Sequence, residues 1–120
     1  MALVVADTNV LVYILNGDTR VSPYLDNDFI ISDITEIELL GVRKLSEKDK
    51  EIRTALLNTC ITSTFDNTTK EIVIQLKQLH SIKIPDAIVA ATAIKYQVPL
   101  LTADKDFKKI PGLSIILIQL

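Results

Sequence analysis

The stretch Ala2-Leu-Val-Val-Ala-Asp7-Thr-Asn9 decides the fold class of this sequence. Its first five residues are apolar without alternation, which is typical of a short strand buried on both faces of a parallel sheet. The next three residues supply side chains that cap a helix, and the apolar run Val10–Leu15 follows them up to a stop at Asn16-Gly17. The caps before this run and the stop after it favour a helix. A buried strand followed at once by a helix predicts an α/β domain.

The same alternation of apolar runs and helical segments continues along the chain. Further strands are expected at Phe29–Ile31, Cys60–Phe65, Pro99–Thr102 and Ser114–Ile118. Helices are expected from the capping box Asp33-Ile-Thr-Glu36, from Ser46 with Asp49, from Asp66 or Thr68, and from Pro85, as first helical residue, to about Tyr96. Because each strand is apolar throughout, we expect a three-layer α/β/α fold with a mainly parallel five-stranded sheet. Residues 1–120 are expected to form a single domain.

Apolar spacing also predicts which side of each later helix is buried. The predicted inward residues are Ile52, Ala55, Leu56 and Thr59 in one helix, Ile72, Val73, Leu76 and Leu79 in the next, and Ala87, Ala90, Ala91 and Ile94 in the last. The last set consists mainly of small residues and predicts close packing.

Composition excludes several classes of protein. At 120 residues and 48% hydrophobic content, the chain can bury a core and is not intrinsically disordered. Its apolar runs are far shorter than the roughly 18 residues of a membrane span, and its first residues lack the basic flank of a secretory signal. Cys60 is the only cysteine, which excludes an internal disulfide and a cysteine-based zinc site. We therefore expect a cytoplasmic protein with no membrane association.

The charge balance does not identify a partner. The net charge is −2, whereas nucleic-acid-binding proteins usually carry a basic surplus. Residues 81–120, however, contain five lysines against three aspartates. Net charge therefore neither supports nor excludes a nucleic-acid substrate.

Four acidic residues are expected to meet at one edge of the sheet. Asp7 ends the first strand, and Asp104 lies just past the fourth. Asp86 is in the first turn of the helix that leads to the fourth strand, and Glu38 lies in an apolar helical stretch after the second. Ligands of open α/β sheets bind outside the carboxyl ends of the strands, which is where these four residues would converge.

Converging carboxylates repel one another unless a cation lies between them. Mg²⁺ and Mn²⁺ prefer oxygen ligands, and one or two such ions can activate water for phosphodiester cleavage. Each acid also has a purely structural interpretation: Asp7 as a helix cap, Asp86 as a first-turn acid, and Asp104 as a turn residue. Only one of Glu36 and Glu38 can face inward, and spacing alone does not decide which.

Four segments of the chain, in order, resemble the PIN-domain family and, within it, the VapC-type ribonuclease toxins of type II toxin–antitoxin systems. They are Val5-Ala-Asp7-Thr-Asn-Val-Leu11, Ile31-Ser32-x-x-Thr35-x-x-Glu38-Leu39, Ile84-Pro-Asp86-Ala-Ile-Val-Ala-Ala-Thr-Ala93, and Pro99-Leu-Leu-Thr102-Ala-Asp104-x-Asp106-Phe107 followed by Ile110-Pro-Gly-Leu113. The third is the most specific, and together they extend over essentially the whole chain. The resemblance selects Glu38 over Glu36 as the inward acid.

The resemblance implies a strand order of 3-2-1-4-5 and a Mg²⁺- or Mn²⁺-dependent endoribonuclease that hydrolyses RNA. It further implies a homodimer and a cognate antitoxin that blocks the site. Asp7 and Asp86 would be the firmest metal ligands, with Glu38 and Asp104 completing an acidic catalytic pocket for one or two ions. Thr8, Asn9 and Thr102 would orient carboxylates or water around the ions.

Two assignments after the fourth strand remain to be tested. Because side chains alternate along an extended chain, Asp104 shares a face with Thr102, so we assign Asp104 to the metal pocket. We assign Asp106 to a hydrogen bond with nearby backbone N–H groups. Lys105, Lys108 and Lys109 are candidates for contacts with substrate phosphates, with a solvated loop as the alternative.

Three other functions compete with this interpretation. A phospho-accepting receiver domain would need an adjacent pair of acids after the first strand and a lysine after the last, and the sequence has neither. A catalytically silent PIN-like module that binds RNA or a partner stays open. So does a DNA-directed nuclease that uses the same acidic pocket.

Overall fold

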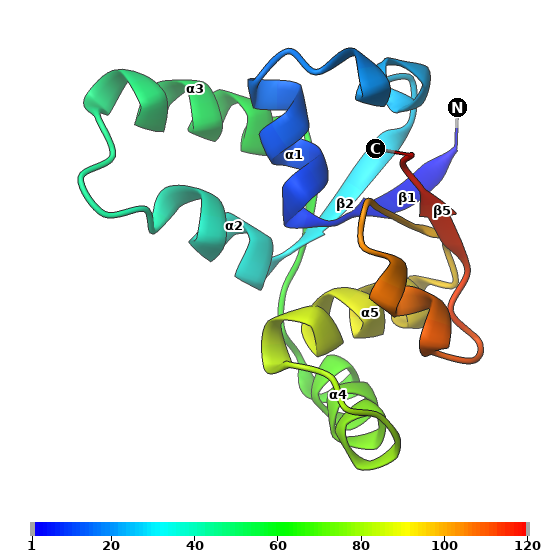
Figure 1. Cartoon of the computed structure of the whole chain (residues 1–120). Coiled ribbons are helices and arrows are strands. Elements are labelled where there is room, and N and C mark those ends of the chain that lie inside the picture. The colour runs from blue at the N-terminus through cyan, green and yellow to red at the C-terminus, as the bar shows by residue number, and fades with distance from the viewer. Residues whose placement is uncertain (1, 120) are drawn as a thin grey trace.

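Five short strands form one parallel sheet at the centre of the molecule (Figure 1). The computed structural model describes residues 2–119. The strands are β1 (Leu3–Ala6), β2 (Asp28–Ser32), β3 (Ile61–Ser63), β4 (Leu100–Thr102) and β5 (Ile115–Leu117). They lie in the order β3-β2-β1-β4-β5, and every pairing is parallel, as predicted. The chain order reverses between β1 and β4, which is where open sheets bind ligands.

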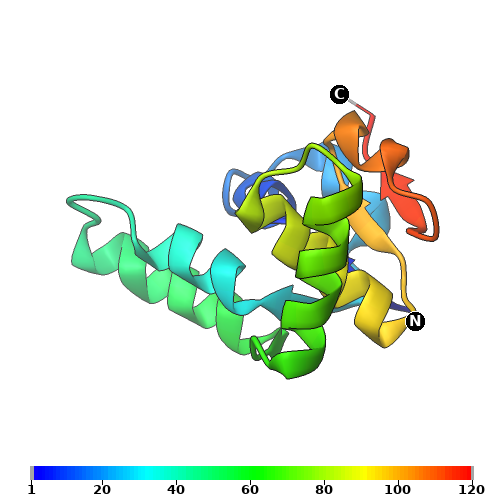
Figure 2. The ribbon, with the colours of Figure 1, turned by 90° about the horizontal axis from the view of Figure 1, so that it is seen from below.

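Helices cover both faces of the sheet. They are α1 (Thr8–Leu15), α2 (Asp33–Leu40), α3 (Glu47–Asn58), α4 (Asn67–Leu79) and α5 (Ile84–Tyr96), with short 3₁₀ helices η1 (Thr19–Tyr24) and η2 (Lys105–Lys109). Figure 1 shows α1 on one side of the sheet and α4 with α5 on the other, which is the expected three-layer arrangement. The hairpin of α2 and α3 projects to one side (Figure 2), and the molecule is 41 Å long in its largest dimension.

The core consists of two clusters, one on each face of the sheet. Val4 and Ala6 of β1 point into the cluster beneath α1, whereas Val5 points into the cluster beneath α5. All three side chains are at most 1% exposed, which explains why this strand is apolar throughout. Within residues 2–119, no helix is both long and apolar enough to cross a membrane.

Small side chains on α5 allow it to lie close to the sheet. Ala87, Ala90 and Ala91 have no exposed surface, and Ile94 packs against the same cluster, as the spacing predicts. Helix α5 begins one residue earlier than expected, at Ile84, so Pro85 is its second residue. This helix places Asp86, in its first turn, near the carboxyl end of the sheet.

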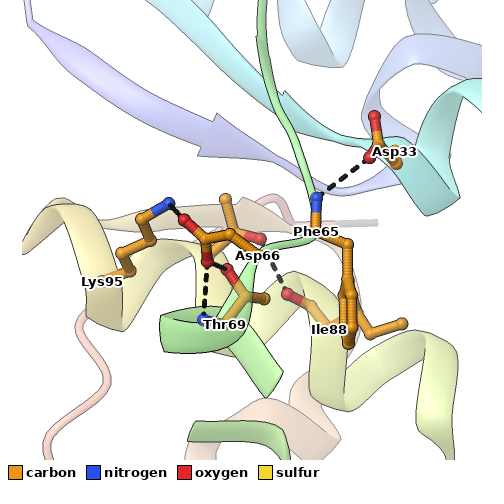
Figure 3. A network of polar contacts seen from close by, with 7 residues as sticks. Asp33, Phe65, Asp66, Thr69, Ile88 and Lys95 are labelled. Atoms are coloured by element: carbon orange, nitrogen blue, oxygen red, sulfur yellow. Dashed lines mark hydrogen bonds and ion pairs between the residues drawn. The ribbon is translucent and has the colours of Figure 1, made fainter. Parts of the chain in front are cut away.

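The expected cap of α2 was wrong by one residue. Ser32, the last residue of β2, caps the helix because its Oγ accepts a hydrogen bond from the Thr35 N–H (3.3 Å). The carboxylate of Asp33 is used elsewhere: its Oδ2 accepts from the Phe65 N–H (2.9 Å) and fixes the segment after β3 (Figure 3). The pair Ser32 and Thr35 therefore caps α2 in place of the predicted capping box of Asp33 and Glu36.

The predicted inward faces of α3 and α4 were partly wrong. In α3, Ile52 is 48% exposed and Ala55 is also exposed, whereas Leu57 is buried. The reason is that α3 packs against α2 with a different side from the one predicted to be buried. On that side, Arg53 Nη1 donates to the Leu39 carbonyl (2.8 Å). In α4, Val73 and Leu76 are buried as predicted, but Leu79 is 76% exposed because the helix ends there.

Asp66 fixes the start of α4 and ties it to α5 (Figure 3). Its Oδ1 accepts from both the N–H and the hydroxyl of Thr69 (2.8 Å each), and its Oδ2 accepts from Lys95 Nζ (2.6 Å). The contact with Lys95, followed by the bonds from Thr69, lowers the pKa of Asp66. The Asp66 carboxylate therefore adds a polar link between α4 and α5, the two helices that cover one face of the sheet.

We expect Asp66→Ala to lower the melting temperature by roughly 3–5 °C at pH 7, because α4 loses its cap and its link to Lys95. Since the folded-state pKa is lowered, this stabilisation is complete above about pH 4 and is lost as the pH falls through the folded-state pKa. The difference from wild type should therefore shrink at pH 3. Thermal melts at both pH values check this, with the exposed α4 substitution Glu71→Ala as the control. An equal difference at both pH values would contradict it.

Candidate active site

Asp7 is the most deeply buried acid at the carboxyl edge of the sheet. It follows β1, caps α1 and is only 8% exposed. Its Oδ1 accepts from the Thr8 N–H (2.8 Å), and its Oδ2 accepts from Thr102 Oγ1 (2.7 Å) and Asn9 Nδ2 (3.2 Å). All three residues predicted to orient the site, Thr8, Asn9 and Thr102, thus donate to the Asp7 carboxylate and fix its position.

Glu38 reaches the same edge from α2. The Thr8 hydroxyl donates to Glu38 Oε1 (2.8 Å), and Thr8 Oγ1 lies 3.2 Å from Thr35 Oγ1. Thr35 has no exposed surface and in turn lies 3.3 Å from Ser32 Oγ. Thr8 therefore links Asp7 to Glu38, with a buried hydroxyl pair behind it.

The sequence did not assign a role to Thr35. The signal was present, because Ser32 and Thr35 are three residues apart at a helix start, a spacing that brings the two side chains together. What the spacing could not indicate is that Thr8, 27 residues away, completes the cluster.

Asp86 lies opposite these residues, half-buried in the first turn of α5. Burial raises its pKa, and the negative charges of Asp104, Glu38 and Asp106 raise it further, while Lys83 lowers it. Burial also raises the pKa of Asp7 against the hydrogen bonds from Thr102 and Thr8, and the charges of Asp86 and Glu38 add to this increase. Asp7 and Asp86 are thus the two acids of this edge whose ionisation is opposed by burial and by neighbouring negative charges.

Asp104 and Asp106 follow β4 and differ from the prediction in one respect. Asp104, not Asp106, makes the structural hydrogen bond: it caps η2 by accepting from the Asp106 N–H at Oδ1 (2.9 Å). The Asp104 N–H donates to Thr102 Oγ1 (3.0 Å), which places Asp104 beside the hydroxyl that binds Asp7. The turn forms directly after the strand, so the cap belongs to its first residue.

A pocket of about 520 Å³ opens beside Asp86, between the end of α4, the start of α5 and η2. We call it the α4–α5 pocket. It is lined by Lys77, Ser81, Ile82, Lys83, Asp86, Asp104, Asp106, Phe107 and Lys109. Two of the four predicted acids thus line it. Of the three lysines predicted as candidates for phosphate contacts, Lys109 lines it, whereas Lys105 and Lys108 are exposed on η2 outside its lining.

The acids at this edge form no ion pairs among the residues that the structure describes. Within residues 2–119, the ion pairs are Arg20–Asp18 and Lys95–Asp66, and neither involves Asp7, Glu38, Asp86 or Asp104. In the same residues, no three acidic, histidine or cysteine side chains lie close enough to hold one ion by themselves. Buried Asn9 Oδ1 also has no hydrogen-bond partner beside Asp7. An oxygen-rich site of this kind fits a hard cation that keeps several of its waters.

Comparison with known proteins gives the family. The PIN domain family model matches residues 4–113. The chain belongs to the PIN-domain family. No curated protein sequence matches this PIN domain at a significant level.

Solved structures extend the comparison. A chain of a toxin–antitoxin complex from Klebsiella pneumoniae is 28% identical (TM-score 0.81), with 97% of this PIN domain and 98% of that chain covered. A chain of FitAcB from Neisseria gonorrhoeae is 26% identical (TM-score 0.77; 97% and 96% covered). A chain of VapBC2 from Rickettsia felis, bound to a promoter DNA fragment, is 25% identical (TM-score 0.73; 99% and 100% covered). These similarities confirm the predicted family and fold.

We expect Asp86→Asn to stabilise the metal-free PIN domain at pH 7, raising its melting temperature by roughly 2–4 °C. The raised folded-state pKa means that ionised Asp86 opposes folding. This opposition is absent below about pH 4, develops between that pH and the folded-state pKa, and is complete above it, so the gain should vanish at pH 3. Thermal melts in a chelator check this, with Asp26→Asn on an exposed loop as the control. A lower melting temperature for Asp86→Asn at pH 7 would contradict it.

Proposed function

We propose that this PIN domain is a divalent-metal-dependent endoribonuclease that hydrolyses RNA phosphodiester bonds, and that it is the toxin of a toxin–antitoxin pair acting in the cytoplasm. Residues 1–120 would act as one nuclease unit. The observation that carries the proposal is the set of acids Asp7, Glu38, Asp86 and Asp104, which face one edge of the sheet and, within residues 2–119, form no ion pair. Such a set destabilises the fold unless it serves to bind a cation.

Mg²⁺ or Mn²⁺ is the cation that the donor atoms favour. All four candidates supply carboxylate oxygens, and Mg²⁺ is commonly held by one or two carboxylates with several waters and substrate phosphates. We assign Asp7 and Asp86 as the main ligands, with Glu38 and Asp104 completing the site for one or two ions. When bound, the ion supplies an acidified water and neutralises charge on a phosphodiester.

The remaining side chains keep these carboxylates in place. Thr102 and Asn9 hold Asp7 Oδ2, so that this carboxylate cannot rotate away when the charges of its neighbours repel it. The Thr8 hydroxyl holds Glu38, and the unpartnered Asn9 Oδ1 can accept a hydrogen bond from a water in the site. A site fixed before substrate arrives needs little rearrangement during the reaction.

The purified chain should cleave RNA with Mg²⁺ or Mn²⁺ and stop when a chelator is added. Asp7→Asn and Asp86→Asn should each lower the cleavage rate by roughly 100-fold or more, because each removes a proposed metal ligand. Gel assays with labelled RNA measure this, and Asp26→Asn should retain the wild-type rate.

Retained cleavage in both ligand variants would overturn the metal-site assignment. Equal cleavage of DNA in a parallel assay would favour the DNA-directed alternative. RNA binding without cleavage in any divalent metal would favour the catalytically silent one.

We further propose that the chain forms a homodimer and binds a cognate antitoxin. Large apolar side chains are exposed on the projecting hairpin and beside the α4–α5 turn, including Ile37 (61%), Ile52 (48%), Leu79 (76%) and Ile84 (57%). Surfaces of this kind mark sites of association. The solved relative from Klebsiella pneumoniae described above is a chain of a toxin–antitoxin complex, which supports an antitoxin as one of the partners.

Light scattering of the purified chain should therefore give the mass of a dimer. Expression of the chain should arrest growth, and co-expression of the product of the adjacent reading frame should relieve the arrest. A monomer at every concentration would contradict the dimer. Growth arrest that no neighbouring gene product relieves would contradict the toxin assignment.

A further inference from the structure

The α4–α5 pocket combines the acidic edge with a separate group of positive charges. It is lined by Asp86, Asp104 and Asp106, and also by Lys77 in the last turn of α4, Lys83 before α5 and Lys109 at the end of η2. Among the described residues, none of these lysines lies within ion-pair distance of a carboxylate. The pocket therefore presents positive and negative side chains that are not joined in ion pairs.

Two of the lysines are held in place by backbone carbonyls. Lys77 Nζ donates to the Ile82 carbonyl (2.7 Å), and Lys109 Nζ donates to the Ser81 carbonyl (2.5 Å). The α4–α5 turn is thus fixed from both sides. An ammonium group has three donors, so each lysine keeps two for a ligand.

Lys83 is exposed and makes no side-chain cap on α5. Its charge lowers the pKa of Asp86, so it lies within electrostatic reach of the acidic edge. An anion on Lys83 would therefore lie next to a cation bound at Asp86.

We propose that the α4–α5 pocket binds, through Lys83, Lys77 and Lys109, a backbone phosphate of single-stranded RNA adjacent to the phosphodiester that is cleaved. This inference rests on the proposed nuclease function. Lysine binds phosphate as a compact point charge, and the pocket volume lies in the range of about 300–1,000 Å³ typical of sites for small ligands. A pocket of that size can take up a phosphate and part of an unstacked nucleotide, which a flexible single strand presents more readily than a duplex does.

Lys83→Gln gives the cleanest test, because this side chain anchors nothing else. Loss of one phosphate contact should weaken binding of a single-stranded RNA about fivefold at 0.1 M salt. It should also reduce the slope of log K against log salt concentration by about 0.7. Fluorescence anisotropy of a labelled oligonucleotide in the Asp7→Asn background measures both without cleavage. Lys50→Gln, exposed on α3, should change neither.

A second set of variants separates the pocket from general positive charge. Lys108→Gln, on η2 outside the pocket lining, should weaken binding less than Lys83→Gln. Lys77→Ala and Lys109→Ala should weaken binding as Lys83→Gln does, with melting temperatures to confirm that they fold. If wild type cleaves RNA but Lys83→Gln binds like Lys50→Gln, or Lys108→Gln loses as much as Lys83→Gln, the pocket assignment is wrong. Absence of cleavage by wild type would instead overturn the proposed nuclease.

Discussion

The burial of the Asp7 carboxylate is the constraint around which this PIN domain is arranged. Asp7 stands where β1 ends and α1 begins, and its Oδ2 accepts from Thr102 at the end of the neighbouring strand β4. One side chain therefore joins two strands and a helix at the point where the strand order reverses. A carboxylate can be buried there because hydrogen bonds satisfy both of its oxygens.

The same burial makes the acidic edge unfavourable for folding. Burial and neighbouring negative charges raise the pKa of Asp7 and of Asp86, and hydrogen bonds offset this only for Asp7. The fold tolerates this because a large apolar cluster packs on each side of the sheet and α5 packs closely through alanines. Stability supplied by the core thus permits an arrangement that bound cations would stabilise, as the proposed function requires.

Much of the fold could be predicted because the local signals agree with one another. The apolar runs, the caps at Asp7, Ser46 and Asp66, and the alanines of α5 each indicated the element that the structure contains. The strand order was predicted from the family resemblance and not from the pattern of apolar residues. The inward face of α3 could not be predicted, because an apolar stripe indicates burial only if another element covers it, and the hairpin projects away from the sheet.

For the candidate site too, some placements could be predicted from local sequence signals and others could not. Asp7, Asp86 and Asp104 could be placed at one edge because each is tied to the end of a strand or the start of a helix. Glu38 could be separated from Glu36 only by the resemblance, since the contact that holds it comes from Thr8, 30 residues away. Asp104 was assigned to the pocket by strand alternation and Asp106 to the structural hydrogen bond by turn chemistry. Because η2 begins directly after Asp104, that hydrogen bond belongs to Asp104.

Net charge is a poor guide to what such a chain binds. The value of −2 averages over acids gathered at the edge of the sheet and lysines brought together by the α4–α5 turn and η2. Cations at the edge would cancel part of the negative charge, so that the lysines dominate the local field. Because an interaction between exposed charges falls off over about 10 Å at 0.1 M salt, a phosphate responds to this local arrangement and not to the total. A mildly acidic chain can in this way present a surface suited to an anionic polymer.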